Sequence, residues 1–139
     1  LAAMMSVALV SCGNGQGEES GAPETTRGAD VEQPFVGLAM HNQTEDWAVQ
    51  FANSFKEAAE AAGAEVAVTD ANSTPANQVS QIEDLVSQGI DVLVVLPADY
   101  TALGNALQTA KDAGVKIVNA DSKVDEADQA LVDCFVTAA

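Results

Sequence analysis

A repeated alternation of apolar runs and helix-like stretches most constrains what this chain can fold into. The runs are dominated by Val, Leu, Ile and Ala, end at polar residues, and occupy residues 35–40, 65–69, 91–96 and 116–120. Apolar runs without polar alternation are typical of strands buried on both faces, as in a parallel sheet covered by helices. The alternation therefore predicts an α/β fold, and residues 130–136 are predicted to add a fifth strand.

The stretches between these runs carry helix start and stop signals. Thr44 is predicted to cap the first helix, and Gly63 to end it. Thr74 and Pro75 form a cap followed by proline at the first helical position, which predicts the start of the second helix. Connections of this length allow right-handed crossovers, so all five strands can lie parallel. We therefore expect a Rossmann-like or flavodoxin-like sheet with helices on both faces.

Polar residues follow the carboxyl ends of the first four predicted strands. They are His41 and Asn42, Asp70, Asp99 and Asp121. Open α/β sheets bind ligands at the carboxyl ends of their strands. The pattern therefore predicts a polar ligand site along this edge.

Composition and charge limit the partners. The chain has 139 residues, 47% of them hydrophobic, which suits one globular α/β domain of ordinary size. With 5 Lys and Arg against 21 Asp and Glu, the net charge of −16 leaves no basic patch for nucleic acid. The carboxylates are scattered, which favours a solvated surface over a metal site. We expect no nucleic acid, metal or cofactor, and a monomer.

The first 33 residues are predicted to lie outside the fold. Residues 1–12 contain an apolar run too short to span a bilayer, as in a secretory signal, and residues 9–12 resemble a bacterial lipobox. Cys12 would then carry lipid and anchor the protein to the membrane. The alternative is an ordinary signal peptide in which Cys12 is incidental. Residues 13–33 are rich in Gly, Glu, Ser and Thr and are predicted to form a disordered acidic tether.

Cys134 is the other cysteine of the chain. If Cys12 carries lipid, no internal disulfide can form. Cys134 lies in an apolar run and is predicted to be a small buried hydrophobic residue. A catalytic thiol would need a nearby histidine, and the only histidine, His41, is far away in the sequence.

The order and spacing of several segments resemble a known family. These segments are FVGLAM at 35–40, Trp47 with residues 51–59, ANQ at 76–78, IEDL at 82–85, GIDVLVV at 89–95, PAD at 97–99 and AGVKIV at 113–118. From residue 35 onward, the chain resembles the amino-terminal lobe of ribose-type sugar-binding proteins of ABC importers. The resemblance implies a two-lobed protein that encloses its ligand and delivers it to a membrane permease. It also implies that the second lobe is absent from this sequence, with the lobe itself occupying residues 34–139.

The resemblance also implies ligand contacts. Asp121 matches an aspartate that accepts hydrogen bonds from sugar hydroxyls, although it could instead cap the following segment. His41 matches a polar contact position, and Trp47 matches an aromatic that stacks on a sugar ring, although Trp47 could instead be a core residue. Asn42 and Glu45 fall where relatives carry polar contacts.

Three further positions bear on the ligand contacts and on the identity of the ligand. Asp99 and Asp70 share the strand-end location but have weaker support from the resemblance. Ser122 stands where ribose-type relatives carry an arginine that binds the sugar. Without that guanidinium, the particular ligand stays open, and a cyclitol, a sugar alcohol or a furanose fits the residues equally well.

Other functional classes fit the sequence poorly. The loop at residues 40–44 has no glycine to cradle a phosphate, and no G-x-S-x-G, H-E-x-x-H or paired-cysteine motif occurs, so we expect no enzyme. The effector domain of a repressor would need a basic helix-turn-helix before residue 35. A lipid-anchored sensor that presents its ligand to a membrane receptor would use the same binding chemistry. We therefore expect an extracytoplasmic binding protein, with sensing as the alternative to transport.

Overall fold

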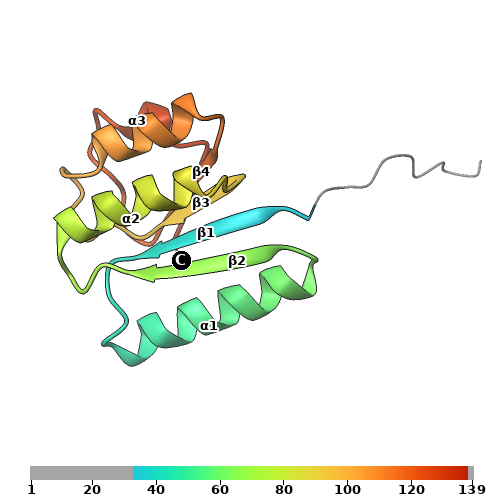
Figure 1. The fold of residues 1–139 in the computed structure, drawn as a ribbon. Helices are drawn as coiled ribbons and strands as arrows, with labels where there is room; N and C mark the ends of the chain where they lie inside the picture. Colours follow the sequence, from blue (N-terminus) through green and yellow to red (C-terminus); the bar gives the residue numbers. More distant parts are fainter. Residues whose placement is uncertain (1–32, 138–139) are drawn as a thin grey trace, which may run out of the picture. The chain divides into compact units, whose positions relative to one another are not determined.

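The described part of the chain folds around a five-stranded parallel sheet, most of which is labelled in Figure 1. The computed structural model describes residues 33–137, so the predicted signal, Cys12 and the tether up to residue 32 lie outside the described residues. The strands are β1 (Phe35–Met40), β2 (Glu65–Asp70), β3 (Val92–Val95), β4 (Lys116–Ala120) and β5 (Cys134–Val136), in the spatial order β2-β1-β3-β4-β5. The helices are α1 (Asp46–Ala61), α2 (Pro75–Ser87), α3 (Gly104–Asp112) and the 3₁₀ turn η1 (Gln129–Leu131). The predicted parallel α/β sheet is confirmed.

Helices lie on both faces of the sheet (Figure 1). On one face, α2 and α3 pack on β1, β3 and β4 through a core that includes Leu85, Leu93 and Ile117. On the other face, α1 packs mainly on β1 and β2 through residues such as Leu38 and Ala52. Successive residues of a strand point to opposite faces, which explains why these apolar runs lack polar alternation. Among residues 33–137, no helix is both long and apolar enough to cross a membrane.

Gly37 lets α2 approach β1 closely. A Cβ atom at this position would lie 2.9 Å from Leu85 Cδ1 and 3.1 Å from Ile90 Cδ1. Both side chains belong to the buried core under α2 and have little room to move. A larger residue at this position would therefore force these side-chain ends to shift within the core.

The helix starts agree with the sequence for α2 and differ for α1. Thr74 is the N-cap residue of α2, with Pro75 at its first position, as predicted. The prediction for Thr44 is wrong, because α1 begins at Asp46 with Glu45 as its N-cap residue. The backbone N–H and the hydroxyl of Thr44 both donate to Asn42 Oδ1, at 3.2 Å each. Thr44 therefore belongs to the preceding loop.

The last strand differs from its prediction in length and exposure. β5 is shorter than the predicted strand because residues 129–131 form the 3₁₀ turn η1, and its pairing with β4 starts at Val118 and Cys134. Just before this point, the Asp133 N–H donates to the Ile117 carbonyl at 2.8 Å, and the Ile117 N–H donates to Asp133 Oδ2 at 2.9 Å. Cys134 is exposed, so the prediction of a buried residue is wrong. The reason is its position in a strand at the edge of the sheet.

Candidate ligand-binding site

The loops that follow the strands gather along one edge of the sheet. The register pairs Met40 with Asp70 and Val95 with Asn119, so the carboxyl ends of β1 to β4 are level. His41 directly follows β1, and Asp121 directly follows β4. Both residues therefore lie at the edge of the sheet where ligands bind in open α/β folds.

His41, Glu45 and Trp47 form a connected group in the loop between β1 and α1. The rings of His41 and Trp47 are stacked, with centroids 5.4 Å apart and planes inclined by 24°. The indole N–H of Trp47 donates a hydrogen bond to Glu45 Oε2. Trp47 is 44% exposed, so it is not a core residue. Its ring is therefore held in a defined orientation while one side remains open to solvent.

Asn42 occupies a different position, beneath this loop. The residue is buried at 7% exposure, and its Oδ1 accepts both hydrogen bonds from Thr44. Its Nδ2 donates to Ser73 Oγ at 3.2 Å, while the Ser73 N–H donates to the His41 carbonyl at 2.8 Å. Asn42 therefore ties the loop after β1 to the loop after β2. This placement favours a supporting role for the amide.

Asp70 and Asp99 use their carboxylates within their own turns. Asp99 Oδ1 accepts hydrogen bonds from the hydroxyl and the N–H of Thr101, each at 2.7 Å, and these bonds hold the pKa of Asp99 below its ordinary value. Asp70 Oδ1 accepts the Asn72 N–H at 2.7 Å. Neither residue lines the cavity that Trp47 and Asp121 share.

Asp121 is exposed and has an unusual backbone conformation. Its φ angle is +67°, in the left-handed region. Its N–H donates to the Val136 carbonyl of β5 at 2.8 Å, and its Oδ2 accepts the Ser122 hydroxyl at 3.0 Å. Only one oxygen of the carboxylate is thus engaged by Ser122. The other oxygen is available as an acceptor for ligand hydroxyls.

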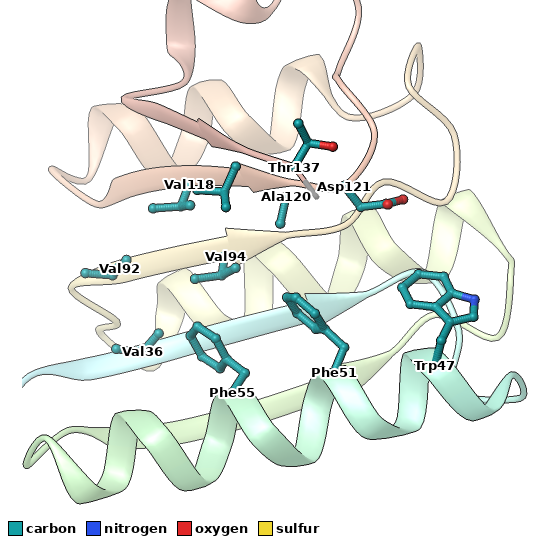
Figure 2. A pocket seen from close by; sticks show the side chains of 11 residues that line it. Val36, Trp47, Phe51, Phe55, Val92, Val94, Val118, Ala120, Asp121 and Thr137 are labelled. Carbon is teal, nitrogen blue, oxygen red and sulfur yellow. The ribbon is translucent and has the colours of Figure 1, made fainter. Parts of the chain in front are cut away.

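An open apolar groove runs beside α1, and Trp47 and Asp121 lie at one end of it (Figure 2). We call it the α1 groove; its volume is about 680 Å³, and its lining includes Val36, Phe51, Phe55, Val94, Val118, Ala120 and Val136. Figure 2 shows the rings of Phe51 and Phe55 pointing from α1 toward the strands. Such a surface offers no hydrogen-bond partners to a polyhydroxylated ligand. Only the end with Trp47 and Asp121 combines an aromatic face with a carboxylate.

Two buried amides escaped the sequence-based prediction. In residues 33–137, the buried polar side chains are Asn42, Gln78 and Asn119. Gln78 Nε2 donates to the carbonyls of Ala39 and Leu96, and Asn119 Nδ2 donates to those of Val95 and Ser122. The sequence signal for Gln78 was its position four residues before Ile82, which puts a glutamine on the apolar face of α2. For Asn119, it was an amide inside an otherwise apolar strand.

Comparisons with known proteins identify the family of the fold. Residues 36–139 match the family model described as a periplasmic binding protein domain. The chain is 33% identical to the D-xylose-binding periplasmic protein of Escherichia coli over 81% of its own length, and 29% identical to the ribose import binding protein of Bacillus subtilis over 66%. A crystal structure from Mycobacterium smegmatis in complex with β-D-fucofuranose is 31% identical, with a TM-score of 0.71, and the match covers 76% of this chain and 34% of that one. The chain spans about a third of the length of the two curated relatives, 33% and 30% respectively.

Proposed function

This chain belongs to the periplasmic-binding-protein family, and on that premise we propose that it captures a sugar or a similar polyhydroxylated small molecule for an ABC importer. The relatives named for D-xylose and ribose support this ligand class. The family description and the name of the D-xylose-binding relative both say periplasmic, which supports a location outside the cytoplasmic membrane. A permease in that membrane is the proposed partner.

The observation that carries the proposal is the pairing of Trp47 and Asp121 at one end of the α1 groove (Figure 2). An indole ring presents a flat apolar face, which suits the C–H face of a sugar ring. A carboxylate accepts hydrogen bonds from two adjacent hydroxyls and binds them more strongly than a neutral acceptor does. His41 and Glu45 fix the orientation of the indole and add polar groups beside it. Together these groups provide a stacking surface and an acceptor for one ligand.

In the proposed whole protein, a second lobe would close over this surface. Sugar-hydroxyl hydrogen bonds contribute only ~0.5–1.5 kcal/mol each, and solvent competes with them on an open surface. We therefore expect this chain alone to bind sugars no better than about millimolar, near −4 kcal/mol. Micromolar binding by a proven monomer of this chain would contradict a site between two lobes.

Binding is tested by saturation-transfer NMR of the chain with D-xylose and D-ribose. We expect transfer to sugar protons in the wild type and its loss in Asp121→Ala. Losing hydrogen bonds to a charged group costs ~1.5–3 kcal/mol, or about tenfold or more in affinity. Glu83→Ala, which changes an exposed carboxylate on α2, is the matched control and should keep the signal. No transfer to either sugar, or equal transfer in the two variants, would contradict the proposed site.

We also propose that Cys12 anchors the protein to the membrane through lipid. Stable anchoring takes more than one acyl chain, which a lipidated amino-terminal cysteine provides. In the native host, a fatty-acid label should enter the wild type and be lost in Cys12→Ala. Cys134→Ala is the matched control, because it removes the only other thiol. Equal labelling of the two variants would refute the anchor.

A further inference from the structure

The backbone at Asp121 is strained and closely held. The Ser122 N–H donates to the Ala120 carbonyl at 3.0 Å, which closes a three-residue γ-turn centred on Asp121. With φ at +67°, this is the rare classic type of γ-turn, which is strained for a residue with a side chain. Some contact must therefore hold the turn.

Asn119 supplies that contact from inside the protein. It is 1% exposed, and its Nδ2 donates to the Ser122 carbonyl at 2.8 Å, directly after the turn. The same nitrogen donates to the Val95 carbonyl at 3.3 Å, and Oδ1 accepts the Val124 N–H at 3.0 Å. The amide thus joins the segment after Asp121 to the end of β3. Both of its polar atoms are engaged by the main chain.

Strand β5 holds the turn from the other side. The Asp121 N–H donates to the Val136 carbonyl at 2.8 Å. The main chain at Asp121 is therefore fixed before the turn by β5 and after it by Asn119. If the bonds of Asn119 were lost, Asp121 could relax to a negative φ, which would redirect the Asp121 side chain.

We propose that Asn119 is a positioning residue that holds Asp121 in its left-handed turn, so that the carboxylate faces ligand at the end of the α1 groove. The proposal rests on the proposed function for its ligand, but the conformation of Asp121 can be measured without ligand. Asn119 itself is buried, at 1% exposure. It acts through the main chain of Ser122 and Val124.

Gln78 provides a matched control for this role. It is also a fully buried amide that donates to two carbonyls and accepts one N–H, that of Ala98. Its partners lie at the ends of β1 and β3 instead of around Asp121. Removing Gln78 therefore disturbs the protein in a similar way without releasing the turn at Asp121.

The test is NMR of the labelled chain without ligand. A positive φ brings the amide proton close to Hα of the same residue, so residue 121 should give a strong intraresidue NOE in the wild type. We expect this NOE to fall by about twofold or more in Asn119→Leu and to persist in Gln78→Met. Asn119→Asp is the second variant, because it keeps the acceptor for Val124 but loses the donors to Ser122 and Val95.

A double-mutant experiment separates positioning from general support. Glycine adopts positive φ without strain, so Asp121→Gly removes the strain of the turn. In the wild type, loss of the Asn119 bonds also lets Asp121 relax and release this strain, so we expect Asn119→Leu to lower the urea midpoint less in the wild type than in the Asp121→Gly background. A residue that merely filled the core would cause the same loss in both backgrounds.

A ligand arm separates this proposal from the proposed function. Saturation transfer to D-xylose should weaken in Asn119→Leu and persist in Gln78→Met. If the wild type shows no transfer, the proposed function fails, while the NOE at residue 121 still decides the role of Asn119. An unchanged NOE in both Asn119 variants, or an equal loss in Gln78→Met, would overturn the positioning role.

Discussion

Replacing Gln78 by methionine tests how much a buried amide contributes to stability at the site edge, the edge of the sheet where the carboxyl ends of β1 to β4 lie. Methionine has nearly the same length and volume but no hydrogen-bonding groups that could replace the amide. The change removes three hydrogen bonds: two to the carbonyls of Ala39 and Leu96, at 3.2 and 2.8 Å, and one from the Ala98 N–H at 2.7 Å. We expect α2 itself to stay intact, so the loss can be assigned to these bonds.

The three bonds do not contribute equally to the free energy of unfolding. The Ala39 carbonyl also accepts the Leu96 N–H, so it keeps a partner. Leu96 is 1% exposed, and its carbonyl would lose the bond from Gln78 in a place that water does not easily reach. Ala98 is half-buried, so water can partly replace its bond. A buried polar group without a partner costs ~1–3 kcal/mol, and we therefore expect a total loss of about 2–4 kcal/mol.

Urea unfolding measures this loss with two independent signals. Trp47 is the only tryptophan, so its fluorescence reports on the site edge, and far-UV circular dichroism reports on the helices. Gln88→Met is the control, because Gln88 is exposed and should change stability by less than about 0.5 kcal/mol. Gln78→Glu should be worse than methionine at neutral pH, because its charge would face two carbonyls. A loss below about 0.5 kcal/mol in Gln78→Met would refute the reasoning.

Two further changes test other parts of the fold. The Ile117 N–H and then Lys111 hold the pKa of Asp133 below its ordinary value near 3.8, so Asp133 stabilises the protein above that pH and loses this effect as pH falls below it. Asp133→Asn should therefore lower the melting temperature at neutral pH and reduce the fall of the melting temperature in acid. The control Asp112→Asn, at an exposed position, should change neither. Parallel acid profiles for Asp133→Asn and the wild type would contradict this. Gly37→Ala should cost ~1–3 kcal/mol in urea unfolding, because the added methyl meets a core side chain at 2.9 Å; an unchanged midpoint would show that α2 can shift freely.

Features set by neighbouring residues could be predicted from the sequence. The bounds of β1 and β4 agree with the apolar runs, because burial on both faces demands continuous apolar residues. The start of α2 agrees as well, since a cap followed by proline acts within one turn. The edge on which His41 and Asp121 lie followed from their positions directly after predicted parallel strands.

Features set by distant residues could not. Thr44 resembles a helix cap, but its N–H and hydroxyl both donate to Asn42. The Asn42 side chain is in turn held by Ser73, which comes from the loop after β2. The exposure of Cys134 depends on its position at the sheet edge, which is a property of the whole sheet. The role of Asn119 depends on carbonyls that only the folded chain brings together. In each case the deciding partner is unknown until the topology is known.

The site edge separates recognition from support at neighbouring positions. Exposed Asp121 lies two residues after buried Asn119, and His41 lies directly before buried Asn42. Under the proposed function, the outward side chains choose the ligand, while the inward amides hold the frame that presents them. Substitutions at the outward positions therefore change the preferred sugar at little cost in stability. Such a division lets one scaffold acquire new specificities through few mutations, because the parts that vary are not the parts that keep it folded.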